Sequence, residues 1–107
     1  MLTFKQLQEE HRIWVEKNFP DSPNYHSLLG VVEEVGELSH AHLKREQGIR
    51  GTEQEHIEEA KDAIGDTIIY LTDYCTRMGF DFQEIMEDTW NQVKQRDWQK
   101  NPKKGTT

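Results

Sequence analysis

The chain has 107 residues, of which 34% are hydrophobic and 31% are charged, and its mean hydropathy is −0.93. This length predicts one domain over residues 1–107, because chains divide into several domains only beyond roughly 200–250 residues. The net charge of −7 repels a phosphate backbone, so nucleic acid is not an expected partner. Cys75 is the single cysteine, which excludes an internal disulfide and a multi-cysteine zinc site.

The sequence contains no apolar run of 18 residues, no signal peptide and no lipidation motif. We therefore expect a soluble, cytoplasmic protein that does not bind membranes. The few apolar residues make a thin core for a monomer, and a homodimer or homotetramer would bury more of them.

Two helices are predicted in the first half of the chain. Thr3 and Gln6 form a capping box, which opens a helix over residues 3–18. Two prolines within residues 19–23 end this helix in a turn. A second helix is expected over residues 24–47, where glycines begin the next loop.

Two more helices are predicted in the second half. Thr52 and Glu55 form another capping box, and the third helix runs over residues 52–78 before Gly79. Asp81 caps a fourth helix that continues to about residue 100. Residues from about 101 to 107 are expected to fray. No segment alternates with the period of a strand, so the sequence predicts an all-α four-helix bundle, completed by oligomerisation.

The second helix carries its acidic and its apolar residues on different faces. Glu34 and Glu37 share a stripe with Gly30 and Ala41, small residues that let another helix approach and leave the carboxylates facing a cleft. One broad, more apolar face holds Leu28, Val31, Val32, Val35, Ser39, His42 and Leu43.

The third helix has a core face and a nearly opposite acidic stripe. The predicted core face consists of Ala60, Ile64, Thr67, Ile68, Leu71, Cys75 and Met78. The acidic stripe consists of Glu55, Glu59, Asp62, Asp66 and Asp73. Like charges four residues apart destabilise a helix, and a divalent cation bound to this stripe would relieve the repulsion between its carboxylates.

Oxygen ligands from two helices suit a hard cation. Mg²⁺ fits best and Mn²⁺ is a possible substitute, because neither requires the nitrogen and sulfur ligands typical of zinc. Such ions invert the local potential, so an acidic protein can bind an anionic polyphosphate.

Two segments resemble the metal motifs of the MazG-like all-α nucleoside triphosphate pyrophosphohydrolases. Residues 30–40, with Glu34 and Glu37, resemble the first motif, Glu-x-x-Glu, and residues 66–71, Asp-Thr-Ile-Ile-Tyr-Leu, resemble the end of the second. The four-helix layout and the tryptophan on the first helix also fit, so the resemblance covers most of the chain.

The second motif of that family, Glu-x-x-Asp, has two possible registers in this chain. Counting back from Asp66 places Ala63 where the glutamate belongs, whereas Glu59 and Asp62 match the motif literally. We favour Asp62 and Asp66 as metal ligands, with Glu59 in reserve, because all three share one helix face.

The resemblance implies Mg²⁺-dependent hydrolysis between the α and β phosphates of a (deoxy)nucleoside triphosphate, which yields the monophosphate and pyrophosphate. Glu33 or Glu34 would be the general base, and the metal ligands would be Glu34, Glu37, Asp62, Asp66 and, in reserve, Glu59. Candidate substrate contacts are Trp14, His26, Lys44, Arg45, Arg50, Lys94 and Arg96.

Three other interpretations remain open. Ala63 is compatible with a non-catalytic helical adaptor that only oligomerises. Two Glu-x-x-His pairs, Glu37 with His40 and Glu53 with His56, match the pattern of a di-iron carboxylate bundle, although they are not expected at the bundle axis. Residues 33–36 resemble a fragment of the Nudix box, a motif whose fold requires a sheet.

Overall fold

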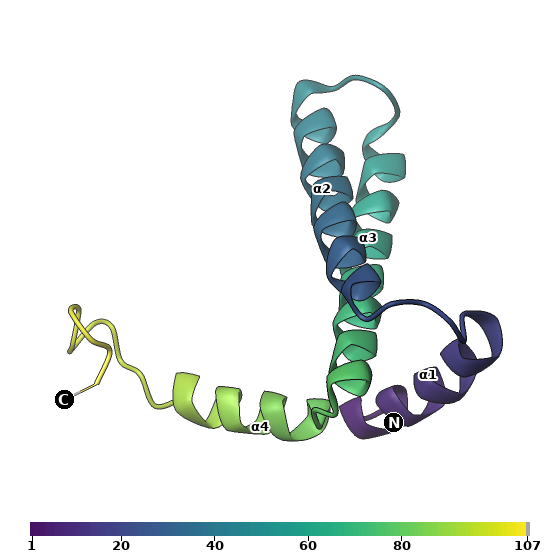
Figure 1. The fold of residues 1–107 in the computed structure, drawn as a ribbon. Helices are drawn as coiled ribbons and strands as arrows, with labels where there is room; N and C mark the ends of the chain where they lie inside the picture. The colour runs from purple at the N-terminus through teal and green to yellow at the C-terminus, as the bar shows by residue number, and fades with distance from the viewer. Residues whose placement is uncertain (107) are drawn as a thin grey trace.

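The computed structural model describes residues 1–106, which contain four helices and no strand (Figure 1). The helices are α1 (Phe4–Asn18), α2 (Tyr25–Gln47), α3 (Glu53–Met78) and α4 (Phe82–Val93). The prediction of an all-α chain with four helices is therefore confirmed. None of these helices combines the length and the apolar composition that a membrane-spanning segment needs.

The helix starts follow the capping residues in the sequence. The hydroxyl of Thr3 accepts a hydrogen bond from the backbone N–H of Gln6, and the side-chain oxygen of Gln6 accepts one from the backbone N–H of Thr3, which completes the capping box. The hydroxyl of Thr52 caps α3 by accepting from the backbone N–H of Glu55. The second bond differs from that of a capping box, because the Glu55 carboxylate accepts from the Thr52 hydroxyl, at 3.1 Å, and not from the Thr52 backbone. Asp81 caps α4.

The fourth helix ends at Val93, not near residue 100 as predicted. Residues 91–100 are exposed, so no neighbouring element stabilises further helical turns there. The chain instead continues in turns, in which the Asp97 N–H donates to the Gly105 carbonyl at 2.7 Å and Gly105 packs under Trp98. The tail expected to fray thus has hydrogen bonds up to Gly105, and its last residue, Thr107, lies outside the described residues.

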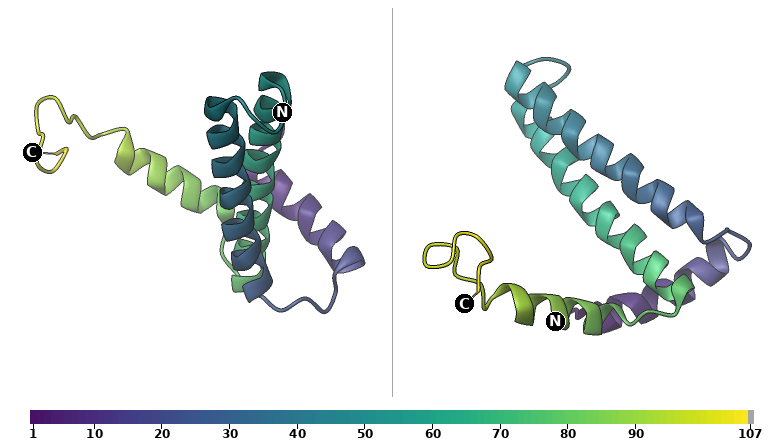
Figure 2. Two further views of the ribbon diagram at one scale, coloured as in Figure 1. Left: turned by 90° about the horizontal axis from the view of Figure 1, so that it is seen from above. Right: turned by 60° about the vertical axis from the view of Figure 1, so that its left-hand side comes forward.

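The helices form an open arrangement around one hairpin. Helices α2 and α3 run side by side in opposite directions, and α1 and α4 extend to different sides of the lower end of α3 (Figures 1 and 2). Helix α1 contacts α3 and α4 but not α2. The radius of gyration is 17.3 Å, whereas a compact domain of this length has one of about 13 Å.

Small residues form the contact between α2 and α3. Gly30, Ala41 and Ala63 are buried, and a Cβ atom at Gly30 would overlap the ring of Tyr70. The prediction that the stripe with Gly30 and Ala41 meets another helix is therefore confirmed.

The predicted core face of α3 is only partly correct. Cys75 is buried, but Ile64 is 54% exposed and Met78 is 41% exposed. The reason is that α2 approaches over the small residue Ala63, so the bulky stripe of α3 is turned away from it. The apolar stripe of α2 is likewise left exposed on this chain at Leu28, Val32, Val35 and Leu43.

Candidate functional site

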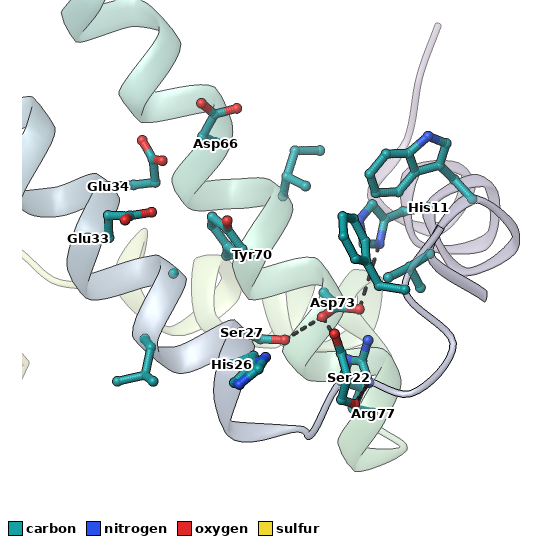
Figure 3. A pocket seen from close by; sticks show the side chains of 16 residues that line it. His11, Ser22, His26, Ser27, Glu33, Glu34, Asp66, Tyr70, Asp73 and Arg77 are labelled. Carbon is teal, nitrogen blue, oxygen red and sulfur yellow. Dashed lines mark hydrogen bonds and ion pairs between the residues drawn. The ribbon is translucent and has the colours of Figure 1, made fainter. Parts of the chain in front are cut away.

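A cleft of about 580 Å³ lies between the hairpin, α1 and the loop that joins α1 to α2. Its walls are the first half of α2, the second half of α3 and one side of α1 (Figure 3). Acidic side chains line one end, and buried polar side chains line the other. These two ends offer different chemistry.

The acidic end joins carboxylates from two helices. Glu33 and Glu34 of α2 and Asp66 of α3 all line it, and Glu34 and Asp66 lie on facing helices (Figure 3). Burial raises the pKa of Glu34, and the negative charges of Asp66, Glu37 and Glu33 raise it further. Among the described residues that line the cleft, no lysine or arginine lies at this end to balance these charges.

Three further predicted metal ligands lie outside the cleft lining. Glu37 is exposed but close enough to Glu34 to affect its pKa. Asp62 is exposed, and the carboxylate of Glu59 lies 3.4 Å from His56. Of the acidic residues in the second motif, Asp66 is therefore the one that faces the cleft.

The acidic end alone supplies too few ligands to enclose a metal ion. No three His, Cys, Asp or Glu side chains within residues 1–106 are grouped closely enough to enclose a metal ion. Mg²⁺ is usually held by one or two carboxylates, with water and substrate phosphates completing its shell. The facing carboxylates of Glu34 and Asp66 fit this incomplete type of site.

Asp73 lies at the centre of the hydrogen bonds at the opposite end of the cleft, and its burial differs from the prediction. The sequence placed it on the acidic stripe, nearly opposite the predicted core face of the third helix, but it is buried and only 7% exposed. Its Oδ2 atom accepts hydrogen bonds from the hydroxyl of Ser27 and from Nε of Arg77, the latter at 2.8 Å. Arg77 also donates to the carbonyl of Ser22 at 2.6 Å. Because α1 and its loop fold over this part of α3, a residue on the acidic stripe becomes buried.

His11 of α1 faces the same carboxylate. Its Nδ1 atom lies 4.0 Å from Oδ1 of Asp73, too far for a hydrogen bond. Both atoms are buried, and neither has a hydrogen-bond partner. Burial lowers the pKa of His11, and the positive charge of Arg77 lowers it further. The negative charge of Asp73 acts in the opposite direction but does not cancel these two effects. The lowered pKa favours the neutral form of the ring.

Aromatic side chains form the remaining walls. Trp14 and Phe19 lie edge to face, with ring centroids 5.8 Å apart, and each is about half exposed. Tyr70 lies between the two ends of the cleft (Figure 3). Burial raises its pKa, and the negative charges of the nearby carboxylates raise it further. His26 also lines the cleft. The predicted substrate contacts Trp14 and His26 are thus on the same cleft as the acidic residues.

The five predicted cationic contacts lie elsewhere on this chain. Lys44 donates to Gln47 at 2.9 Å, and Arg45 pairs with Glu53 at 2.9 Å at the far end of the hairpin. The remaining three are exposed in the loop after α2 or beyond the end of α4, and they are Arg50, Lys94 and Arg96.

The residues of the di-iron alternative are also apart from the cleft. Nε2 of the buried His56 lies 2.9 Å from the carbonyl oxygen of Ile49, and Glu53 is engaged with Arg45. Glu37 and His40 are exposed on α2. These placements do not assemble an iron ligand set within one chain.

Four polar side chains that line the cleft were not singled out from the sequence, namely His11, Ser27, Tyr70 and Arg77. A usable signal was present on α3, because Asp66, Tyr70, Asp73 and Arg77 are spaced by four, three and four residues and therefore share one face. His11 and Ser27 carry no such signal, since their positions depend on how α1 and α2 pack.

Comparisons with protein-family models, with curated proteins and with solved structures found no match to this chain.

Proposed function

We propose that this chain is a Mg²⁺-dependent nucleotide pyrophosphohydrolase, which cleaves (deoxy)nucleoside triphosphates between the α and β phosphates. The observation that carries this proposal is the facing pair of Glu34 and Asp66, joined by Glu33 at one end of the cleft. Three carboxylates share that end without a lysine or arginine among the described lining residues. A site of this composition suits a cation that in turn attracts phosphate oxygens.

Glu34 and Asp66, which both line the cleft, are the proposed metal ligands, whereas Glu37 lies outside the lining and would join them only after its side chain moves. When bound there, Mg²⁺ would neutralise and orient the phosphate oxygens of the substrate. Asp62 and Glu59 are less well placed, because they lie outside the cleft lining.

Glu33 or Glu34 would accept a proton from the attacking water. The new bond joins the water oxygen to the α phosphorus, and the bond between that phosphorus and the bridging oxygen breaks, which releases pyrophosphate. Most of the catalysis would come from positioning and charge neutralisation.

We also propose that the protein works as a homodimer or homotetramer whose helices complete a bundle. The support is the apolar stripe of Leu28, Val32, Val35 and Leu43, which one chain leaves exposed, together with the large radius of gyration. Lys44, Arg45, Arg50, Lys94 and Arg96 lie outside the cleft of their own chain, so they would reach a triphosphate only in such an assembly.

The proposal is tested by measuring pyrophosphate release from a panel of nucleoside triphosphates with and without Mg²⁺. The variants Glu34→Gln and Asp66→Asn should each lose activity by about 100-fold or more. Glu10→Gln changes an exposed carboxylate outside this cleft and should retain activity. Calorimetry in the absence of nucleotide measures Mg²⁺ binding directly. This binding should weaken in Glu34→Gln and Asp66→Asn but not in Glu10→Gln.

A folded, oligomeric protein that releases no pyrophosphate with Mg²⁺ or Mn²⁺ would overturn the enzymatic proposal. The exposed apolar stripe of α2 would then favour the second candidate function, a non-catalytic helical adaptor. Weak Mg²⁺ binding, unchanged by Asp66→Asn, would point the same way.

A further inference from the structure

The buried end of the cleft has hydrogen-bonding capacity that the protein does not use. Oδ1 of Asp73 and Nδ1 of His11 are both without a partner, and their side chains are only 10% and 9% exposed. Buried polar atoms without partners are rare in folded proteins because each costs free energy. Two such atoms 4.0 Å apart, in the wall of a cleft, therefore require an explanation.

A purely structural role accounts for only one of the two carboxylate oxygens of Asp73. Ser27 and Arg77 both bond to Oδ2, which ties α3 to α2 and, through the carbonyl of Ser22, to the loop after α1. These contacts leave Oδ1 free on the side that faces His11 (Figure 3). Because Oδ1 contributes nothing to these contacts, it remains available to a ligand.

The position of Asp73 suits the far end of an elongated ligand. Asp73 follows Asp66 by seven residues on one face of α3, which corresponds to about 10 Å along the helix axis. Tyr70 lies between them, and Trp14 and Phe19 present flat, half-exposed rings on the opposite wall. A ligand with phosphates near Asp66 would thus place its base beside aromatic rings and the His11–Asp73 pair.

We propose that the His11–Asp73 pair binds the hydrogen-bonding edge of a nucleobase such as cytosine or adenine. In both bases this edge has an exocyclic amino group next to an unprotonated ring nitrogen. This inference rests on the proposed function, because it takes the base of the bound nucleotide as the ligand. The amino group donates to Oδ1 of Asp73. The ring nitrogen accepts from Nδ1 of His11.

The chemistry of the pair selects for this edge. An ionised carboxylate only accepts hydrogen bonds, and a neutral imidazole that faces a carboxylate is favoured with its proton on the facing nitrogen. Uracil and hypoxanthine present the reverse pattern, with a carbonyl oxygen and a protonated ring nitrogen at the same positions. Their carbonyl would face a buried carboxylate, which is unfavourable.

Both atoms are covered in the free chain, so a base reaches them after a local movement of α1. The Trp14 ring lies 5.6 Å from that of His11 and is 52% exposed, which makes it the side chain that a planar ligand displaces or stacks upon. The backbone of α1 packs against α3 and α4 and not against α2, so a shift of the His11 or Trp14 side chain leaves the packing of α2 on α3 in place.

The test is calorimetric binding of matched nucleoside monophosphates, which does not depend on hydrolysis. Deoxycytidine monophosphate is compared with deoxyuridine monophosphate, and deoxyadenosine monophosphate with deoxyinosine monophosphate. The wild type should bind at least one amino member about 10- to 100-fold more tightly than its keto counterpart. The pair that shows the difference identifies the base. Asp73→Asn should reduce the ratio to below about threefold, and His11→Gln should reduce it in the same direction.

Ser27→Ala is the matched control, because it removes a partner of Oδ2 and leaves Oδ1 unchanged. It should keep the amino preference even if it lowers stability. Equal binding of amino and keto members by the wild type would overturn the inference, whatever the variants do, and so would an equal loss of preference in Ser27→Ala and Asp73→Asn. Amino-selective binding without pyrophosphate release would support the inference and contradict the proposed activity, whereas pyrophosphate release without selectivity would do the reverse.

Discussion

The ring of Tyr70 on α3 lies directly against Gly30 on α2, so close that a single methyl group at residue 30 would overlap it. This contact brings the two helices together where the cleft begins. It keeps Tyr70 between the acidic end and the His11–Asp73 pair. The hairpin and the cleft therefore depend on the same glycine.

Gly30→Ala should destabilise the protein by about 1–3 kcal/mol, because the added methyl group has to push the ring or the helix away. Gly36 is the control on the same helix, since no atom lies near its Cβ position. Gly36→Ala should stabilise by up to about 1 kcal/mol through helix propensity alone. Urea unfolding of both variants measures this, and equal effects would show that the contact with Tyr70 is unimportant.

Glu34 predicts a specific pH dependence of stability in the metal-free protein. Its pKa is raised in the folded state by burial and by neighbouring carboxylates. The folded state then binds more protons than the unfolded one at pH values just above the ordinary carboxyl pKa of about 4.3. Stability should fall as the pH rises through this window, and Glu34→Gln should remove that part of the fall.

The measurement is the free energy of unfolding with a chelator present, taken at several pH values above 4. The difference between wild type and Glu34→Gln carries the signal, because this substitution removes the titrating carboxylate and its interactions with Asp66, Glu37 and Glu33. Glu10→Gln should follow the wild type. A difference that does not change with pH would contradict the raised pKa of Glu34.

Asp66 and Asp62 should contribute unequally to activity. Asp66 lines the cleft with Glu34, whereas Asp62 lies outside the lining. Asp66→Asn should therefore lower kcat/KM by about 100-fold or more, with a smaller loss, of about tenfold or less, for Asp62→Asn. Steady-state kinetics on the preferred nucleotide decide between the two registers, and a larger loss in Asp62→Asn would reverse the assignment.

The apolar stripe of α2 should mediate self-association. The wild type should sediment at or above twice the 12.7 kDa mass of one chain. Val32→Glu places a charge in the stripe, at a side chain that is 70% exposed on the single chain, and should shift the protein toward monomers. Lys17→Glu on α1 is the control and should not do so. A monomeric wild type at micromolar concentration would contradict the proposed assembly.

The helices and their starts could be predicted because the signals are local. Thr3, Thr52 and Asp81 cap the helices that they were expected to cap, and Gly48 and Gly79 end α2 and α3 with positive φ angles. The end of α4 could not be predicted in this way. The helical pattern continues beyond Val93, but no neighbouring element supports it there.

The acidic end of the cleft was predictable because Gly30 and Ala41 mark the side of α2 that another helix can approach. The other end was not, since the burial of Asp73 depends on α1 and its loop crossing α3. The exposed position of Ile64 has the same kind of cause. Helical periodicity shows that α3 has a bulky face, but small residues such as Ala63 decide which face meets α2.

The central claim is that the acidic end directs water to the α phosphorus. Phosphorus NMR of deoxynucleoside triphosphates incubated with the protein and Mg²⁺ tests it most directly, because it identifies both products. The account predicts a nucleoside monophosphate and pyrophosphate in equal amounts, with no product in Asp66→Asn. A nucleoside diphosphate with orthophosphate would contradict it, as would unchanged substrate for every nucleotide tested.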